Sequence, residues 1–302
     1  MVPIRAAAES PEIWISPPED VTQHGKDFHE LFLHPEQWSR AAIKIKRFSM
    51  AVNYLLLSPP ERVTKELRVL HDLGIPLDVA VQALPVDKKA CGNGIEGTVW
   101  PGEPKNYSMK LKALGVDVYS FSLDLPLTAG HRDKSSQSCH LSIRETAERT
   151  AGATADILAV YPNAKIVDIE VPTGIPASEW STDLQEWIDD YRHASGRDFD
   201  GFMMDAWWKF DWRSAAQETV RVLKPRHIPV GIGIDASGLK FVPAAQWIAE
   251  AQKNDCALEA AHIPLNYIGV SNFQNVQVLS LPETNPATLT GLVIWLSSYH
   301  AC

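Results

Sequence analysis

The chain has 302 residues, of which 45% are hydrophobic and 22% charged, with a formal net charge of −9. This length suits one (β/α)8 barrel, which typically takes about 250 residues, and the composition is that of a globular protein with a full core. The acidic balance argues against nucleic acid and anionic membranes as main partners. No apolar run approaches the roughly 18 residues of a membrane span, and residues 1–14 lack the apolar stretch of a signal peptide.

Predicted strands alternate with predicted helices along most of the chain. Residues 1–45 read as an extension that packs on the barrel, with Phe28, Leu31, Phe32 and Trp38 among its apolar residues. Strands are expected at 48–57, 77–83, 117–124, 165–171, 199–206, 228–235, 265–272 and 290–297.

Strand and helix alternation predicts a parallel sheet. We therefore expect one (β/α)8 barrel domain over 1–302, with a short or missing last helix because the chain ends soon after the eighth strand. An open, doubly wound sheet is the competing fold, but no glycine-rich phosphate loop follows the first strand.

Four of the predicted strands end in a carboxylate: Asp124, Glu170, Asp205 and Asp235. In a barrel the C-terminal strand ends open into one mouth, where the active site lies. Glycoside cleavage needs one carboxyl group to protonate the leaving oxygen and another to attack or to activate water. The pattern predicts a glycoside hydrolase, with Glu170 as general acid/base and Asp205 as its catalytic partner.

Other side chains near these strand ends are expected to bind substrate. Alternation puts Asp168 on the same face as Glu170, one layer lower. The full set of expected substrate-binding residues is Glu96, Asp124, Asp168, Asp235, Asn272, Trp100, Trp207, Trp208 and His131. The tryptophans are candidate stacking platforms for sugar rings, although tryptophan is more often a core residue. Caps, salt bridges and solvated turns remain open as structural roles for the acids.

The four cysteines do not fix the compartment. Cys91 and Cys139 both fall in loops on the expected active face, where either a disulfide or two free thiols would fit. Cys256 lies in a predicted helix and Cys302 ends the sequence, so we expect both to be free. No tight cluster of His and Cys ligands is present, and we expect neither a metal nor a cofactor.

Several segments resemble a family of uncharacterised bacterial proteins thought to be barrel-type glycoside hydrolases. The matching segments are 91–104, 123–131, Cys139-His140, 161–172, 203–212 and 278–293. The resemblance implies a barrel fold, a carbohydrate substrate, and site roles for Glu96, Asp124, Glu170 and Asp205.

The chain departs from that family in one motif. Where the family usually reads Asp-Glu-Pro, this chain reads Asp124-Leu125-Pro126, and strand seven ends without an acid at Ser271-Asn272. A non-catalytic carbohydrate-binding barrel is therefore an alternative, and a polysaccharide lyase is another. We expect a secreted or periplasmic protein, with a cytoplasmic one still open, that is a monomer or weak homodimer.

Overall fold

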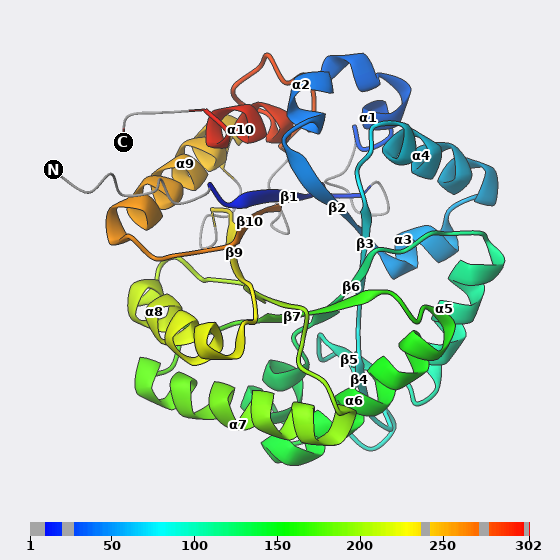
Figure 1. Cartoon of the computed structure of the whole chain (residues 1–302), viewed down its shortest axis with the longest axis vertical. Helices are drawn as coiled ribbons and strands as arrows, with labels where there is room; N and C mark the ends of the chain where they lie inside the picture. Colours follow the sequence, from blue (N-terminus) through cyan, green and yellow to red (C-terminus); the bar gives the residue numbers. More distant parts are fainter. Residues whose placement is uncertain (1–9, 20–26, 237–241, 272–277, 299–301) are drawn as a thin grey trace, which may run out of the picture.

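The computed structural model describes residues 10–19, 27–236, 242–271, 278–298 and 302. Within these residues, parallel strands close into an eight-stranded barrel inside a ring of helices, as Figure 1 shows. The predicted (β/α)8 barrel is confirmed. Going round it, the strands are β1 (Glu12–Ser16), β2 (Ile45–Ala51), β3 (Leu77–Val81), β6 (Ser120–Asp124), β7 (Lys165–Glu170), β8 (Gly201–Met204), β9 (Val230–Ile234) and β10 (Tyr267–Ser271).

The helices follow the strands around the outside. The main ones are α3 (Val52–Leu57), α4 (Pro60–Asp72), α5 (Glu103–Ala113), α6 (Ile143–Val160), α7 (Ala177–Ser195), α8 (Trp212–Leu223), α9 (Ala244–Ala261) and α10 (Leu289–Leu296). Shorter elements are α1 (Glu30–Leu33), η1 (Pro35–Gln37), α2 (Ser39–Ala42), the π-helical turn η2 (Thr128–Arg132) and η3 (Lys224–Arg226). A small two-stranded sheet, β4 (Leu84–Pro85) with β5 (Thr98–Val99), lies in the connection between β3 and α5.

The two ends of the chain differ from the sequence prediction. The segment expected as a packing extension contributes strand β1, which pairs with both β10 and β2 and buries Ile13 and Ile15. The run expected as the eighth strand, 290–297, is instead helix α10, which begins where Thr288 Oγ1 accepts the Gly291 N–H at 3.1 Å. In Figure 1 the blue strand β1 closes the barrel between β10 and β2, with the red helix α10 outside it. The last helix is present, and it is short.

The lower half of the barrel, at the N-terminal strand ends, is filled with side chains. The Tyr267 ring lies across it, in space left by Gly201 and Gly231; an added Cβ at Gly231 would lie 2.2 Å from that ring. Trp14 stacks on Tyr267 with ring centroids 4.1 Å apart. Nearby, buried Asp78 accepts hydrogen bonds from three serines on neighbouring strands: Ser49, Ser120 and Ser122. The C-terminal strand ends form the other end of the barrel, its mouth.

Both cysteine pairs are bonded. The Cys91–Cys139 disulfide joins the loop after β4 to the loop after η2. Cys256 on α9 is bonded to Cys302, so the expectation that these two are free was wrong. Forty-six residues separate them in sequence, and only the folded chain brings them together. No helix in the described ranges has the length and apolar composition to cross a membrane.

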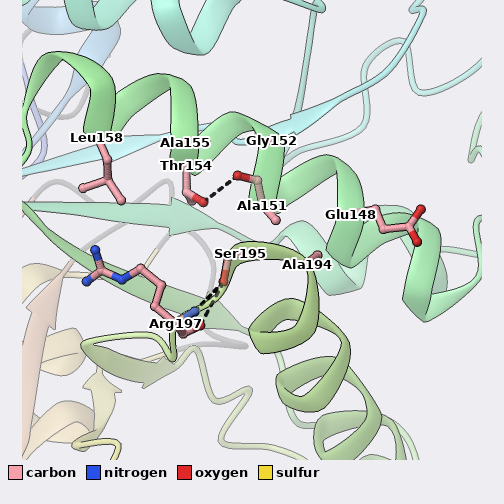
Figure 2. A pocket seen from close by; sticks show the side chains of 9 residues that line it. All are labelled: Glu148, Ala151, Gly152, Thr154, Ala155, Leu158, Ala194, Ser195 and Arg197. Atoms are coloured by element: carbon pink, nitrogen blue, oxygen red, sulfur yellow. Dashed lines mark hydrogen bonds between the residues drawn. The ribbon is translucent and has the colours of Figure 1, made fainter.

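Two surface hollows lie away from the mouth. One, of about 510 Å³, runs between α6 and α7 and is lined mainly by small residues, with Glu148 and Arg197 towards opposite ends (Figure 2). The other, of about 410 Å³, opens at the N-terminal strand ends beside Arg47 and Lys165. Neither is lined by the strand-end carboxylates, so the candidate site has to be argued from the mouth itself.

Candidate active site

The pairing of the strands shows which side chains point into the barrel. Asp124 on β6 is paired with Ile169 on β7, and Ile169 with Met203 on β8. Met203 points inward, because an added Cβ on Gly269, which lies on β10 beyond the intervening strand β9, would be 2.8 Å from its Cε. Paired residues of parallel strands share a face, and so do residues two apart. Asp124 and Asp205 therefore both face the mouth.

Three carboxylates influence one another near this mouth: Asp124 at the end of β6, Asp205 just after β8, and Glu96 on the loop before β5, whose charge acts on both aspartates. Asp124 and Asp205 are half-buried, while Glu96 is exposed. Their carboxyl oxygens have no hydrogen bond or ion pair with any other residue that the structure describes. Carboxyl groups that keep some exposed surface and have no partner among the described residues are available to a ligand.

The pKa values of two of these groups are displaced upward. Burial raises the pKa of Asp124 to about 8, and the neighbouring charges of Glu96, Asp205 and Glu170 add to the increase. Burial also raises the pKa of Asp205, to about 6, with a further contribution from Glu96. Near pH 7 Asp124 is therefore mostly protonated and Asp205 mostly ionised.

The structure gives Glu170 a different environment from the one expected. Its side chain has no exposed surface. Oε1 accepts the Leu127 N–H at 2.6 Å, and Oε2 accepts the Thr128 N–H at 3.0 Å and the Thr128 hydroxyl at 2.6 Å. Burial raises its pKa to about 7, against these hydrogen bonds and the nearby Arg132. A carboxylate that holds the start of η2 in this way does not fit the expected role of proton donor to a substrate.

Asp168 is also turned away from the mouth. Trp187, on helix α7 outside the barrel, donates its Nε1–H to Asp168 Oδ2 at 2.7 Å, and Asp168 has no exposed surface. The expectation that Asp168 and Glu170 share a face is consistent with their contacts, but that face looks towards the helices. Asp168 is therefore not placed to bind substrate as expected. It makes a buried hydrogen bond between the sheet and α7.

The aromatic residues after β8 divide into an exposed pair and a buried pair. Trp207 and Phe210 are 45% and 42% exposed, and their rings stack with centroids 5.9 Å apart. Lys209 Nζ lies 5.4 Å from the Trp207 ring centroid. Trp208 is only 8% exposed and packs against Trp212, so it does not offer the expected stacking surface.

The remaining expected site residues are placed as follows. Trp100 is 43% exposed and follows β5. His131 is half-buried within η2, and its Nδ1 lies 2.9 Å from the Leu141 carbonyl oxygen. Asp235 is buried, and its backbone carbonyl accepts from Asn254 on α9 at 2.9 Å. Asn272 lies outside the described residues. Over the ranges that are described, no three His, Cys, Asp or Glu side chains gather in a way that suits a metal ion.

Sequence reasoning undervalued two residues. Asp124 was expected only to bind substrate, yet its pKa is raised further, to about 8, than the pKa of Asp205, the other mouth-facing aspartate, at about 6. Phe210 was not among the expected site residues, although the WWKF run of residues 207–210 held the signal. Leu125, the residue after Asp124, is 8% exposed and has a φ of 52°.

The fold resembles many solved barrels. A psychrophilic glycoside hydrolase family 10 endo-β-1,4-xylanase superposes with a TM-score of 0.52 at 10% identity, over 88% of this chain and 86% of that one. A fungal β-1,4-galactanase gives 0.51 at 10% identity, over 86% and 90%. A xylanase from Cellvibrio japonicus gives 0.53 at 11% identity, over 89% and 59%. At these identities the likeness shows the barrel fold alone.

No protein-family model matches the sequence, and no curated protein matches it. The class that fold and site define together is thus a (β/α)8 barrel, similar in structure to glycoside hydrolases, with a carboxylate group at its mouth.

Proposed function

We propose that the protein is a glycoside hydrolase in which Asp124 is the general acid and Asp205 is the base or nucleophile. The observation that carries this proposal is the pair of mouth-facing carboxyl groups whose pKa values, about 8 and about 6, lie on opposite sides of neutrality. Two carboxyls with separated pKa values are what acid and base roles at one site require. The barrel fold and its likeness to xylanases and a galactanase support the same class.

The chemistry follows from these protonation states. Protonated Asp124 donates its proton to the glycosidic oxygen as the bond to the anomeric carbon breaks. Ionised Asp205 either attacks that carbon or removes a proton from an attacking water. Glu170, held by Leu127 and Thr128, fixes the loop that follows Asp124.

A carbohydrate substrate fits the aromatic surface beside the acids. Trp207 follows Asp205 by two residues, and its exposed ring next to Phe210 offers an apolar face for a sugar ring. The proposed substrate is an oligosaccharide or a polysaccharide. The proposal also includes kinship with the uncharacterised bacterial family that the sequence resembles. Two disulfides favour an oxidising compartment, and we propose a secreted or periplasmic location on that ground.

The test is reducing-end release from a panel of glucans, galactans and bacterial exopolysaccharides. Wild type should release reducing ends from at least one of these glycans. Asp124→Asn and Asp205→Asn should each release none. Asp117→Asn is the matched control, because Asp117 is exposed and precedes β6 at the opposite end of the barrel from Asp124. If both mouth variants hydrolyse as fast as wild type, the assignment fails.

The pH profile gives a second check. kcat/KM should rise as Asp205 ionises near pH 6 and fall as Asp124 ionises near pH 8, with an optimum near 7. Because the two groups interact, the two apparent pKa values of this profile belong to the Asp124–Asp205 pair and not to either residue alone.

The same assays test the alternative functions. If wild type binds glycans but releases no reducing ends, the result favours a carbohydrate-binding barrel. An unsaturated product absorbing in the ultraviolet identifies a lyase.

A further inference from the structure

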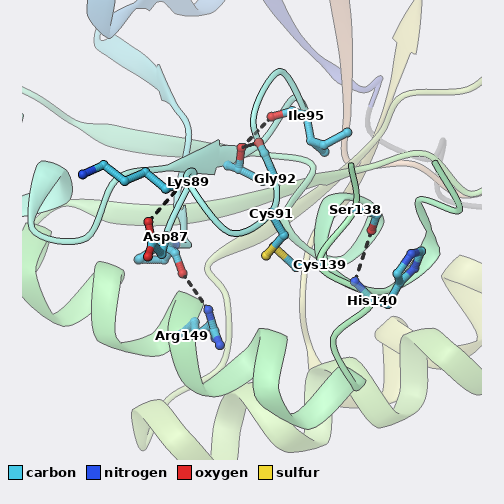
Figure 3. Close-up of a disulfide and its surroundings, with 11 residues drawn as sticks. Asp87, Lys89, Cys91, Gly92, Ile95, Ser138, Cys139, His140 and Arg149 are labelled. Carbon is cyan, nitrogen blue, oxygen red and sulfur yellow. Dashed lines mark hydrogen bonds between the residues drawn. A yellow bond between two sulfur atoms is a disulfide. The ribbon is translucent and has the colours of Figure 1, made fainter. Parts of the chain in front are cut away.

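The loop that carries Glu96 is held at one end by a disulfide and a hydrogen bond and at the other end by hydrogen bonds. Cys91 is bonded to Cys139, and the neighbouring Gly92 N–H donates to the Gln137 carbonyl at 2.5 Å. At the other end the Thr98 hydroxyl lies 2.7 Å from the carbonyl oxygens of both Gly92 and Ile95. Figure 3 shows the disulfide joining this loop to the segment that leads into α6. The loop is therefore fastened to the segment that follows η2.

Gly97 sets how close this loop comes to the catalytic strand end. A Cβ added there would lie 2.5 Å from the Asp124 carbonyl oxygen, 3.0 Å from that of Leu125 and 3.1 Å from Ala129 Cβ. Its φ of 84° is also in the left-handed region that glycine tolerates best. The backbone next to Glu96 thus rests directly on the backbone of Asp124, with no side chain between them.

We infer that Glu96 is a positioning residue of the Asp124–Asp205 site and that the Cys91–Cys139 disulfide holds it there. The inference rests on the proposed function for its catalytic consequence. Besides burial, the charges of three carboxylates on three elements raise the pKa of Asp124: Glu96 on the disulfide-bonded loop, Asp205 after β8 and Glu170 at the end of β7. Of these three, Glu96 alone sits on a loop fixed by a covalent bond.

Glu96 acts through Asp124. Glu96 is exposed, and the structure describes no hydrogen bond that commits its carboxylate to another residue. Its charge next to Asp124 disfavours ionisation of Asp124, which keeps the proton that the reaction donates. If the loop moves away, Asp124 loses a like charge, gives up its proton at lower pH, and is a weaker source of acid at neutrality.

The experiment follows the Asp124 carboxyl directly, without a substrate. Protein labelled with ¹³C at the aspartate carboxyl carbon is titrated by NMR, and Asp124 is assigned by its absence from the spectrum of Asp124→Asn. The variants are Glu96→Gln, Glu96→Asp and Cys91→Ser/Cys139→Ser. Cys256→Ser/Cys302→Ser is the matched control, since it removes a disulfide of nearly equal sequence separation, 46 against 48 residues. Circular dichroism verifies that each variant is folded.

Glu96→Gln should lower the titration midpoint of Asp124 by about one pH unit, the size expected when one neighbouring like charge is removed. The Cys91→Ser/Cys139→Ser variant should lower it in the same direction, while Glu96→Asp and the control pair should leave it near the wild-type value. An unchanged midpoint in Glu96→Gln overturns the inference, whatever the disulfide variant does. An unchanged midpoint in the disulfide variant overturns the role of the disulfide.

These outcomes separate the inference from the proposed function. Loss of glycan hydrolysis in Asp124→Asn with no midpoint shift in Glu96→Gln leaves the hydrolase standing and removes the role of Glu96. A midpoint shift in Glu96→Gln together with full hydrolysis by Asp124→Asn supports the effect of Glu96 on Asp124 and refutes the catalytic role of Asp124. If both the proposed function and the role of Glu96 are right, kcat/KM of Glu96→Gln should begin to fall on the alkaline side at a lower pH than kcat/KM of wild type.

Discussion

Replacing Asp124 by Asn should make the protein more stable at alkaline pH. The folded protein holds the pKa of Asp124 at about 8, against 3.8 as the ordinary value. A raised carboxyl pKa contributes stability that is complete below the ordinary pKa and is lost as the pH rises through the folded value. Asn cannot ionise, so Asp124→Asn escapes that loss.

The magnitude follows from the size of the displacement. A pKa raised from 3.8 to about 8 corresponds to about 5 to 6 kcal/mol at 1.36 kcal/mol per pH unit. Asp124 is only half-buried, and Glu96 is exposed. Solvent therefore screens part of the repulsion, and we expect about 2 kcal/mol of the difference to appear between pH 4.5 and pH 9.

The assay is urea unfolding of wild type and Asp124→Asn at pH 4.5, 6.5 and 9. The free energy of unfolding should fall with pH in wild type more steeply than in the variant, so that the two curves diverge. Asp200→Asn is the contrasting control, because Asp200 accepts the Ile166 N–H at 2.9 Å and pairs with Lys165 at 3.2 Å; this variant should be less stable at pH 9. Parallel curves for wild type and Asp124→Asn would refute the reasoning.

Three further results are expected. Glu170→Gln should lower the free energy of unfolding by about 1 to 3 kcal/mol, seen as a lower melting temperature, because an amide NH₂ would face the N–H of Leu127 or Thr128. Breaking the Cys91–Cys139 bond, which spans 48 residues, should cost about 4 kcal/mol in urea unfolding on the chain-entropy model; a loss near zero would contradict it. Trp207→Ala should weaken calorimetric binding of a hydrolysed oligosaccharide by about 1 kcal/mol, and unchanged binding would exclude its ring as a stacking surface.

The barrel was predictable from the sequence because its middle strands carry strong local signals. Each barrel strand from β3 to β9 is mostly a run of apolar or small residues, and a helix follows it before the next barrel strand. The two chain ends lacked such signals. Strand β1 has five residues, and residues 290–296 form an apolar run that suits a helix or a strand equally by pattern. Pairing of β1 with both β2 and β10 decides the matter, since it closes the barrel before α10 begins.

The site was less predictable, because alternation shows which residues share a face without showing which face it is. Asp168 and Glu170 alternate correctly along β7, but the Trp187 contact shows that Asp168 faces the helices. The register between β6 and β7 then turns Asp124 inward together with Ile169. Both observations depend on contacts between elements that are distant in sequence, so the local pattern of one strand could not predict them.

Two kinds of buried carboxyl therefore stand on neighbouring strands, and their surroundings separate them. Glu170 is fully buried and accepts three hydrogen bonds, so the protein uses both of its oxygens. Asp124 is half-buried, faces like charges and accepts no hydrogen bond from any described residue. A buried polar group without a hydrogen-bond partner costs stability, and carboxyls with strongly raised pKa values cluster at functional sites. Asp124, the costly one, is for that reason the better candidate for a catalytic group, and Glu170 for a structural one.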